Sequence, residues 1–119
     1  PASVETFWGT GEHLEKYGPR MDRVGGPYGA YLFGVDTPRP VVFAERSLEP
    51  AAAKLPYHRY RVTGQELPPA WRIETGRVIP AVGGRGGGRQ VLFRDAGKGL
   101  LSVEELLETG LLEEVRERA

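Results

Sequence analysis

Residues 83–93 read GGRGGGRQVLF and join a glycine-rich turn directly to a segment with the character of a β-strand. Glycine tolerates positive φ and lets a ligand approach the backbone closely, at an entropic cost. Alternation after the turn places Val91 and Phe93 on one face of the predicted strand and Gln90 and Arg94 on the other. The turn is interpreted either as a ligand-binding loop or as a hairpin tip kept soluble by its arginines, and the local pattern leaves both interpretations open.

Short strands are predicted on both sides of this turn. Residues 57–63 alternate regularly, residues 30–34 and 72–79 are two further candidates, and residues 89–94 follow the glycines. Seventeen glycines and ten prolines indicate many turns. The sequence shows none of the crossover helices that parallel strands require. We therefore expect a small α+β domain with five or six mostly antiparallel strands arranged as two sheets.

Short helices are predicted near both ends of the chain. Thr10 is expected to cap a helix over residues 11–17. Ser102 and Glu105 have the spacing of a capping box, which opens a second short helix that ends at Gly110. Together with the strands, these helices predict a core covered at its two ends.

Composition excludes several classes of protein. The chain has 119 residues with 16 basic and 16 acidic side chains, so we expect one domain and no nucleic-acid binding driven by bulk charge. Cysteine is absent, which rules out disulfides, thiol nucleophiles and cysteine-ligated metals. No apolar run approaches the roughly 18 residues of a membrane span. Since Pro1 is not followed by a signal segment, we expect an excised or processed domain.

Few side chains are candidates for chemistry. His13 and His58 are the only histidines, so no protein-held metal is expected, and His13 is expected to be exposed on its helix. The chain lacks a Gly-x-Ser-x-Gly nucleophile elbow, and its glycine turn lacks the Lys-Ser/Thr and the following helix of a phosphate-binding P-loop. Arginines beside glycine or aromatic residues are binding candidates, because guanidinium groups hydrogen-bond phosphate and stack on rings. These are Arg23, Arg46, Arg85 and Arg89.

Five segments, taken in order, resemble one known family. They are Arg23 with Gly25, then Tyr28-Gly29-x-Tyr31-Leu32, Ala44-Glu45-Arg46-Ser47-Leu48-x-Pro50, Pro56-Tyr57-His58-x-Tyr60-x-Val62 and Gly86-Gly87-Gly88-x-Gln90. This ordered set resembles the tuberculosis necrotizing toxin family of NAD⁺ glycohydrolase domains, and the similarity runs from about Met21 to Val115. The resemblance implies hydrolysis of the nicotinamide–ribose bond of NAD⁺ or NADP⁺. It also implies a fold related to ADP-ribosyltransferase cores.

The resemblance further implies a set of site residues. The catalytic ones are Gln90, Arg46 and Tyr31, and the substrate-binding ones are Arg23, His58, Phe33, Gly88 and Arg89. Gln90 is expected to hydrogen-bond the ribose on the nicotinamide side or to orient the attacking water, and Arg46 and Arg23 to bind phosphate. NAD⁺ or NADP⁺ is then the substrate, and neither a cofactor nor a metal is expected.

The resemblance also implies a domain layout and a biological setting. Residues 1–119 are expected to form one domain, with a helical extension over 1–20 and the catalytic core over 21–119. A toxin of this kind would be secreted or delivered into the cytosol of a target cell. Its partner would be a cognate immunity protein that blocks the active site, with no nucleic-acid or membrane partner. Two alternatives stay open: an ADP-ribosyltransferase with a macromolecular acceptor, and a non-catalytic nucleotide-binding module.

Overall fold

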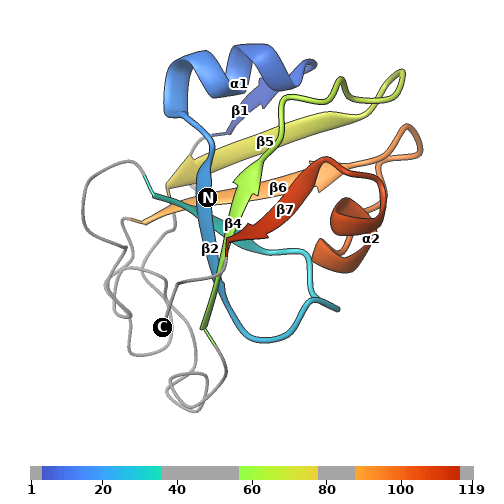
Figure 1. Ribbon diagram of the computed structural model, residues 1–119. Coiled ribbons are helices and arrows are strands. Elements are labelled where there is room, and N and C mark those ends of the chain that lie inside the picture. Colours follow the sequence, from blue (N-terminus) through green and yellow to red (C-terminus); the bar gives the residue numbers. More distant parts are fainter. Residues whose placement is uncertain (1–3, 36–56, 78–87, 116–119) are drawn as a thin grey trace.

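Seven strands and two helices occupy residues 4–35, 57–77 and 88–115, which are the residues that the computed structural model describes (Figure 1). In chain order they are β1 (Glu5–Phe7), α1 (Thr10–Tyr17), β2 (Arg20–Val24), β3 (Leu32–Gly34), β4 (Tyr57–Val62), β5 (Arg72–Arg77), β6 (Arg89–Arg94), α2 (Val103–Glu108) and β7 (Leu112–Val115). The strands predicted over 30–34, 57–63 and 89–94 are confirmed with small shifts of their ends, as is the described part of the strand predicted over 72–79. The α+β class is confirmed as well.

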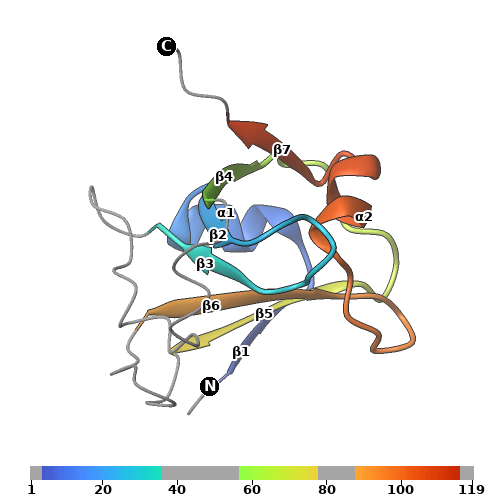
Figure 2. The same ribbon diagram turned by 90° about the horizontal axis from the view of Figure 1, so that it is seen from below.

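The prediction of two sheets is wrong for the described residues. All seven strands join one antiparallel sheet in the order β1-β5-β6-β3-β2-β4-β7. The pairing of β3 with β6 connects the two halves through Leu32 opposite Val91 and Phe33 opposite Gln90. Strand twist accumulates across the sheet, so β5 and β6 run across the direction of β2 and β4 (Figure 1). Seen from below, β5 and β6 lie in one layer and β4 and β7 in another (Figure 2).

The hydrophobic core lies on one face of this twisted sheet, which we call the inner face; the other is the outer face. Neighbouring residues alternate between the two, as the sequence of β4 predicted: Tyr60 and Val62 are buried, whereas Arg59 and Arg61 are exposed. Side chains from both halves of the sheet meet in the core, together with residues of α2. The fully buried members include Met21, Leu32, Ile73, Val91, Phe93, Val103 and Leu106.

The two helices differ in how well the sequence predicted their ends. The capping box of α2 is confirmed, because Ser102 Oγ accepts a hydrogen bond from the Glu105 amide at 3.1 Å and the Glu105 carboxylate accepts one from the Ser102 amide at 3.2 Å. Gly110 follows with φ of 78°. Thr10, however, is the first residue of α1, after Gly9, and its hydroxyl donates to the carbonyl of Gln65 at 2.8 Å. Thr10 therefore ties α1 to a distant loop and is not its cap.

The strand β1 was missed by the sequence analysis because three residues are too few to show alternation. It pairs with β5 at the edge of the sheet, with Phe7 opposite Ile73. Residues 5–17 thus pack directly on the sheet. The expected division into a helical extension over 1–20 and a catalytic core over 21–119 stays a prediction. None of the helices in the described part of the chain is long and apolar enough to cross a membrane.

Candidate functional site

Gln90 and Phe33 lie side by side on the outer face. Phe33 is opposite Gln90 in the β3–β6 pair and opposite Asp22 in the β2–β3 pair, and Asp22 is opposite Arg59 in the β2–β4 pair. Directly paired residues share a face, so Arg59, Asp22, Phe33 and Gln90 form one row across four strands, which we call the outer row. Phe33 and Asp22 are buried, Gln90 is half-buried and Arg59 is exposed. The hydroxyl of Thr75 donates to the Gln90 carbonyl at 2.8 Å and holds the backbone there.

Asp22 is a buried carboxylate that the sequence analysis did not select. The Tyr57 hydroxyl donates a hydrogen bond to Asp22 Oδ2 at 2.7 Å. Burial, and then this hydrogen bond, raises the pKa of Tyr57 above its ordinary value, so the phenol keeps its proton at neutral pH. The guanidinium of Arg59 lies 5.8 Å from the centre of the Tyr57 ring. The strand β2 reads Arg-Met-Asp-Arg-Val, without regular alternation, so no local pattern identified Asp22 as a buried residue.

Arg23 lies on the inner face and closes the loop between β2 and β3. Its Nε donates to the carbonyl of Gly26 at 2.6 Å, and its Nη1 donates to the carbonyl of Tyr31 at 2.9 Å. A Cβ atom on Gly29 would lie 2.7 Å from Arg23 Cζ, so glycine is needed there to admit the guanidinium. Burial lowers the pKa of Arg23 below its ordinary value, although an arginine remains charged. Arg23 therefore positions the backbone of Tyr31, whose side chain is exposed.

His58 stands directly opposite Arg23 in the β2–β4 pair. It is half-buried, and its Nδ1 lies 3.2 Å from Glu114 Oε2 on the edge strand β7. The ring centres of His58 and Tyr60 are 6.2 Å apart. The contact between His58 and Glu114 could not be predicted from the sequence, because only the pairing of β4 with β7 brings the two residues together.

Arg89 is buried in the core, with 2% of its surface exposed. Its Nη1 donates to Thr75 Oγ1 at 2.9 Å and lies 3.2 Å from His13 Nε2, and its Cζ lies 3.9 Å from the centre of the Tyr17 ring. Because a guanidinium has no acceptor, His13 must accept at Nε2 and is neutral in this contact. The predictions that Arg89 faces substrate and that His13 is exposed are therefore corrected: both belong to a polar cluster inside the fold.

The predicted site residues thus fall into separate groups. The structure brings Gln90 together with Phe33 on the outer face and Arg23 together with His58 on the inner face, and Gly88 is buried just before β6. Arg46 and Arg85 lie outside the described residues. Within the described ranges, no cluster of three or more His, Cys, Asp or Glu side chains could hold a metal ion. In the outer row, the half-buried Gln90 and the exposed Arg59 are accessible to a ligand, whereas Phe33 and Asp22 between them are buried.

Comparisons with known proteins give a consistent result. A family model described as Tuberculosis necrotizing toxin matches residues 15–115. Two proteins named Outer membrane channel protein CpnT, from Mycobacterium bovis and Mycobacterium tuberculosis, are 38% identical over 99 residues, which is 83% of this chain and 12% of theirs. The solved structure of tuberculosis necrotizing toxin complexed with its immunity factor IFT matches with a TM-score of 0.88 and 34% identity, over 95% of this chain and 56% of that one.

Proposed function

Since the chain belongs to the tuberculosis necrotizing toxin family, we propose that it is an NAD⁺ glycohydrolase that releases nicotinamide and ADP-ribose from NAD⁺ or NADP⁺. The observation that carries the proposal is the position of Gln90. Residue Gln90 is half-buried on the outer face opposite Phe33, and its backbone carbonyl accepts a hydrogen bond from the Thr75 hydroxyl. The side-chain amide therefore starts from a fixed backbone position, and it can hydrogen-bond a ribose hydroxyl or a water molecule.

The reaction needs little help with its leaving group. Nicotinamide is positively charged in NAD⁺ and leaves neutral when the bond between its nitrogen and C1′ of the ribose breaks. The oxocarbenium-like ribose then forms a bond to the oxygen of water, and one proton of that water passes to solvent. The protein has to bind the dinucleotide and stabilise the developing positive charge. We assign Gln90 to the ribose or the water, and Tyr31 to contact with the substrate.

The remaining predicted residues take supporting roles in this proposal. Arg23 contributes by holding the loop that carries Tyr31 through its bonds to Gly26 and Tyr31. Phosphate binding by Arg46 rests on the family resemblance alone. His58 lies beside Arg23 on the inner face, where it contacts Glu114, and its role in the reaction rests on the family resemblance alone. A relation of this fold to ADP-ribosyltransferase cores also remains a proposal.

Turnover of fluorescent etheno-NAD⁺ by Gln90→Ala tests the assignment. We expect kcat/KM to fall by about 100-fold, as for the loss of one transition-state donor, while the thermal midpoint stays near that of the parent chain. The matched control is Gln65→Ala, the other glutamine of the chain, whose amide donates to the Thr109 carbonyl far from the outer row. Full activity in a folded Gln90→Ala variant contradicts the assignment. Incubating NAD⁺ with the protein alone distinguishes hydrolysis from transfer to a macromolecule, because free ADP-ribose formed without any acceptor indicates hydrolysis.

We also propose that this chain acts as a delivered toxin with a cognate immunity protein. Support comes from the solved relative, which is described in complex with its immunity factor, and from the relatives described as outer membrane channel proteins. Expressed inside a bacterial host, the parent chain should deplete NAD⁺ and stop growth, whereas Gln90→Ala should do neither. Growth arrest that persists with Gln90→Ala would argue against NAD⁺ loss as its cause.

A further inference from the structure

His13 is a titratable side chain that is enclosed by the fold and lies against a positive charge. It is 0% exposed, and its Nε2 accepts a hydrogen bond from Arg89 Nη1 at 3.2 Å. The ring centres of Phe7 and Tyr17 lie 5.4 and 5.5 Å from that of the imidazole. Because a guanidinium only donates, the imidazole makes this hydrogen bond only while Nε2 carries no proton.

Protonation of His13 opposes the folded arrangement in three ways. It takes away the acceptor that Arg89 uses, so a buried donor loses its partner. It also sets a second positive charge beside the guanidinium, and it holds that charge away from water. Tyr17 does not compensate it, because the hydrogen bond to Glu5, and then burial, raise the pKa of the Tyr17 hydroxyl and keep it protonated.

The acidic side chains around α1 lie outside this buried contact. Glu5 is exposed and already accepts hydrogen bonds from Lys16 and Tyr17. Glu12 and Glu66 are exposed beside the start of the helix. The charged side chains on the described elements around His13 are Arg89 on β6, Arg77 directly opposite it on β5, Glu5 on β1, Glu12, Glu15 and Lys16 on α1, and Glu66 in the loop that follows β4.

The helix that carries His13 belongs to a unit at the edge of the sheet. Residues 5–17, which we call the N-terminal unit, comprise β1 and α1, and β1 pairs with β5 alone. Phe7 joins the core, and Thr10 donates to the Gln65 carbonyl at 2.8 Å. Because β1 is an edge strand, the N-terminal unit can separate from the sheet without breaking any pairing between the other strands.

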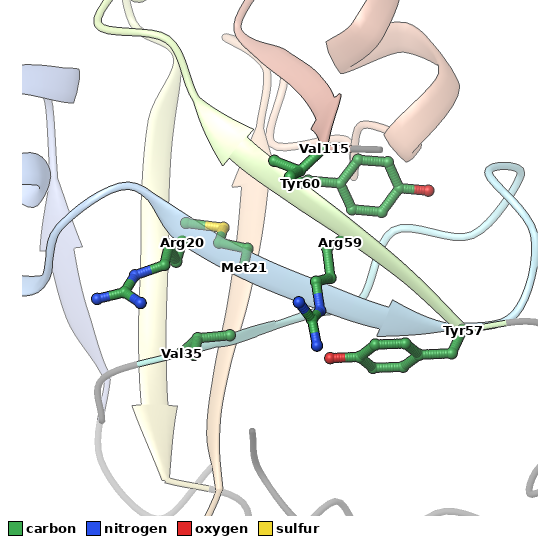
Figure 3. Close-up of a pocket in the computed structure, with 7 residues that line it drawn as sticks. All are labelled: Arg20, Met21, Val35, Tyr57, Arg59, Tyr60 and Val115. Atoms are coloured by element: carbon green, nitrogen blue, oxygen red, sulfur yellow. The ribbon is translucent and has the colours of Figure 1, made fainter. Parts of the chain in front are cut away.

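The part of the sheet around β2 and β4 has contacts of its own. The described residues that line a pocket of about 150 Å³ there come from β2, β4 and β7, with Val35 beside them (Figure 3). Met21 stands opposite Tyr60, and they are 1% and 2% exposed. These two strands therefore provide a reference against which a motion of the N-terminal unit can be measured.

We propose that His13 is an acid-sensitive latch: when it is protonated, the N-terminal unit separates from the sheet while β2 and β4 stay paired. An accessible histidine takes up a proton near about pH 6.5, whereas His13 in the closed unit stays neutral. The open state then binds one proton more than the closed state below about pH 6.5. The equilibrium constant for opening therefore rises by up to about tenfold for each unit that the pH falls. The proposal involves no substrate and is independent of the proposed function.

Hydrogen exchange of the whole chain, followed by NMR, measures this opening. The reporters are hydrogen-bonded amides at α1 such as that of Gly18, which donates to the Leu14 carbonyl at 2.8 Å. Their protection factors, which are corrected for the intrinsic exchange rate, should fall by about tenfold between about pH 6.5 and pH 5. They should also lie below those of β2 and β4, because a local opening is more frequent than global unfolding. Hydrogen bonds from Lys16 and then Tyr17 lower the pKa of Glu5 below 4.5, so Glu5 contributes little in this range.

The two histidines of the chain provide the variant and its matched control. His13→Gln keeps an acceptor for Arg89 but cannot titrate, so its α1 protection should stay constant over this range. His58→Gln should keep the slope of the parent chain. A slope that persists in His13→Gln, or α1 protection equal to that of β2 and β4, overturns the latch.

The parent chain gives a second test that requires no substitution. The ring ¹⁵N signals of His13 should report a neutral imidazole throughout this pH range as long as α1 is protected. A protonated His13 ring in a chain whose α1 amides keep their full protection overturns the proposal. This measurement holds even for a His13→Gln variant that does not fold.

Discussion

Gly34 and Arg89 should be strongly coupled in their effects on stability. Gly34 is the last residue of β3, and the buried guanidinium of Arg89 lies directly against its Cα. A Cβ added at Gly34 would lie 2.7 Å from Arg89 Nε and closer still to Cζ and Nη2. Gly34 is not among the residues with positive φ, so alanine fits the backbone conformation. Gly34→Ala therefore measures packing against Arg89 alone.

The cost of Gly34→Ala follows from how far the guanidinium must move. Unstrained contacts need about 3.5 Å, so the nearest guanidinium atom, Nη2, must shift by about 1.5 Å. That shift weakens the 2.9 Å bond to Thr75 and the 3.2 Å contact with His13 inside the core. Overpacking and a buried donor without its acceptor together predict a loss of about 2 to 4 kcal/mol in the free energy of unfolding. This is a large part of the roughly 5 to 15 kcal/mol that a domain has in total.

Urea unfolding of Gly34→Ala, Arg89→Met and the double variant gives the coupling directly. Methionine is flexible and carries no charge, so Gly34→Ala should cost less than about 1 kcal/mol in the Arg89→Met background. The coupling energy should therefore exceed about 1 kcal/mol. Equal costs of Gly34→Ala in both backgrounds, within about 0.5 kcal/mol, would refute the close packing of these two residues.

Two further predictions concern α2 and the outer face of β5. Ser102→Ala removes the reciprocal bonds with Glu105 and should lower the free energy of unfolding by about 1 kcal/mol in urea, whereas Ser102→Asp should keep most of it. Burial raises the pKa of Glu74, but hydrogen bonds from two arginines outweigh it, so its net pKa lies below 4.5. The unfolded chain then binds a proton before the folded one does, and stability should fall as the pH drops below about 4.5. Glu74→Gln should flatten that part of the pH profile, and an unchanged slope would contradict this contribution.

Local patterns predicted those parts of the fold that depend on neighbours in the chain. Alternation in residues 57–63 identified the buried side of β4, and the spacing of Ser102 and Glu105 identified the start of α2. The same alternation, extended two residues back from Val91, would have placed Arg89 on the inner face. The glycine turn suggested a ligand instead, although the glycine that accommodates Arg89 is Gly34 on another strand. The sequence around Arg89 cannot reveal that a glycine on another strand provides the space for its side chain.

The sequence alone was sufficient to identify the family, because five short motifs of that family occur in order between Arg23 and Gln90. The family model, which matches residues 15–115, confirms this identification. The sequence could not say which of these residues share a face. That depends on strand register, and a shift by one residue moves every side chain to the opposite face. The pairing of β3 with both β2 and β6 sets Gln90 in line with Asp22 and Arg59. The outer row therefore arises from contacts between strands far apart in the chain, which no local pattern encodes.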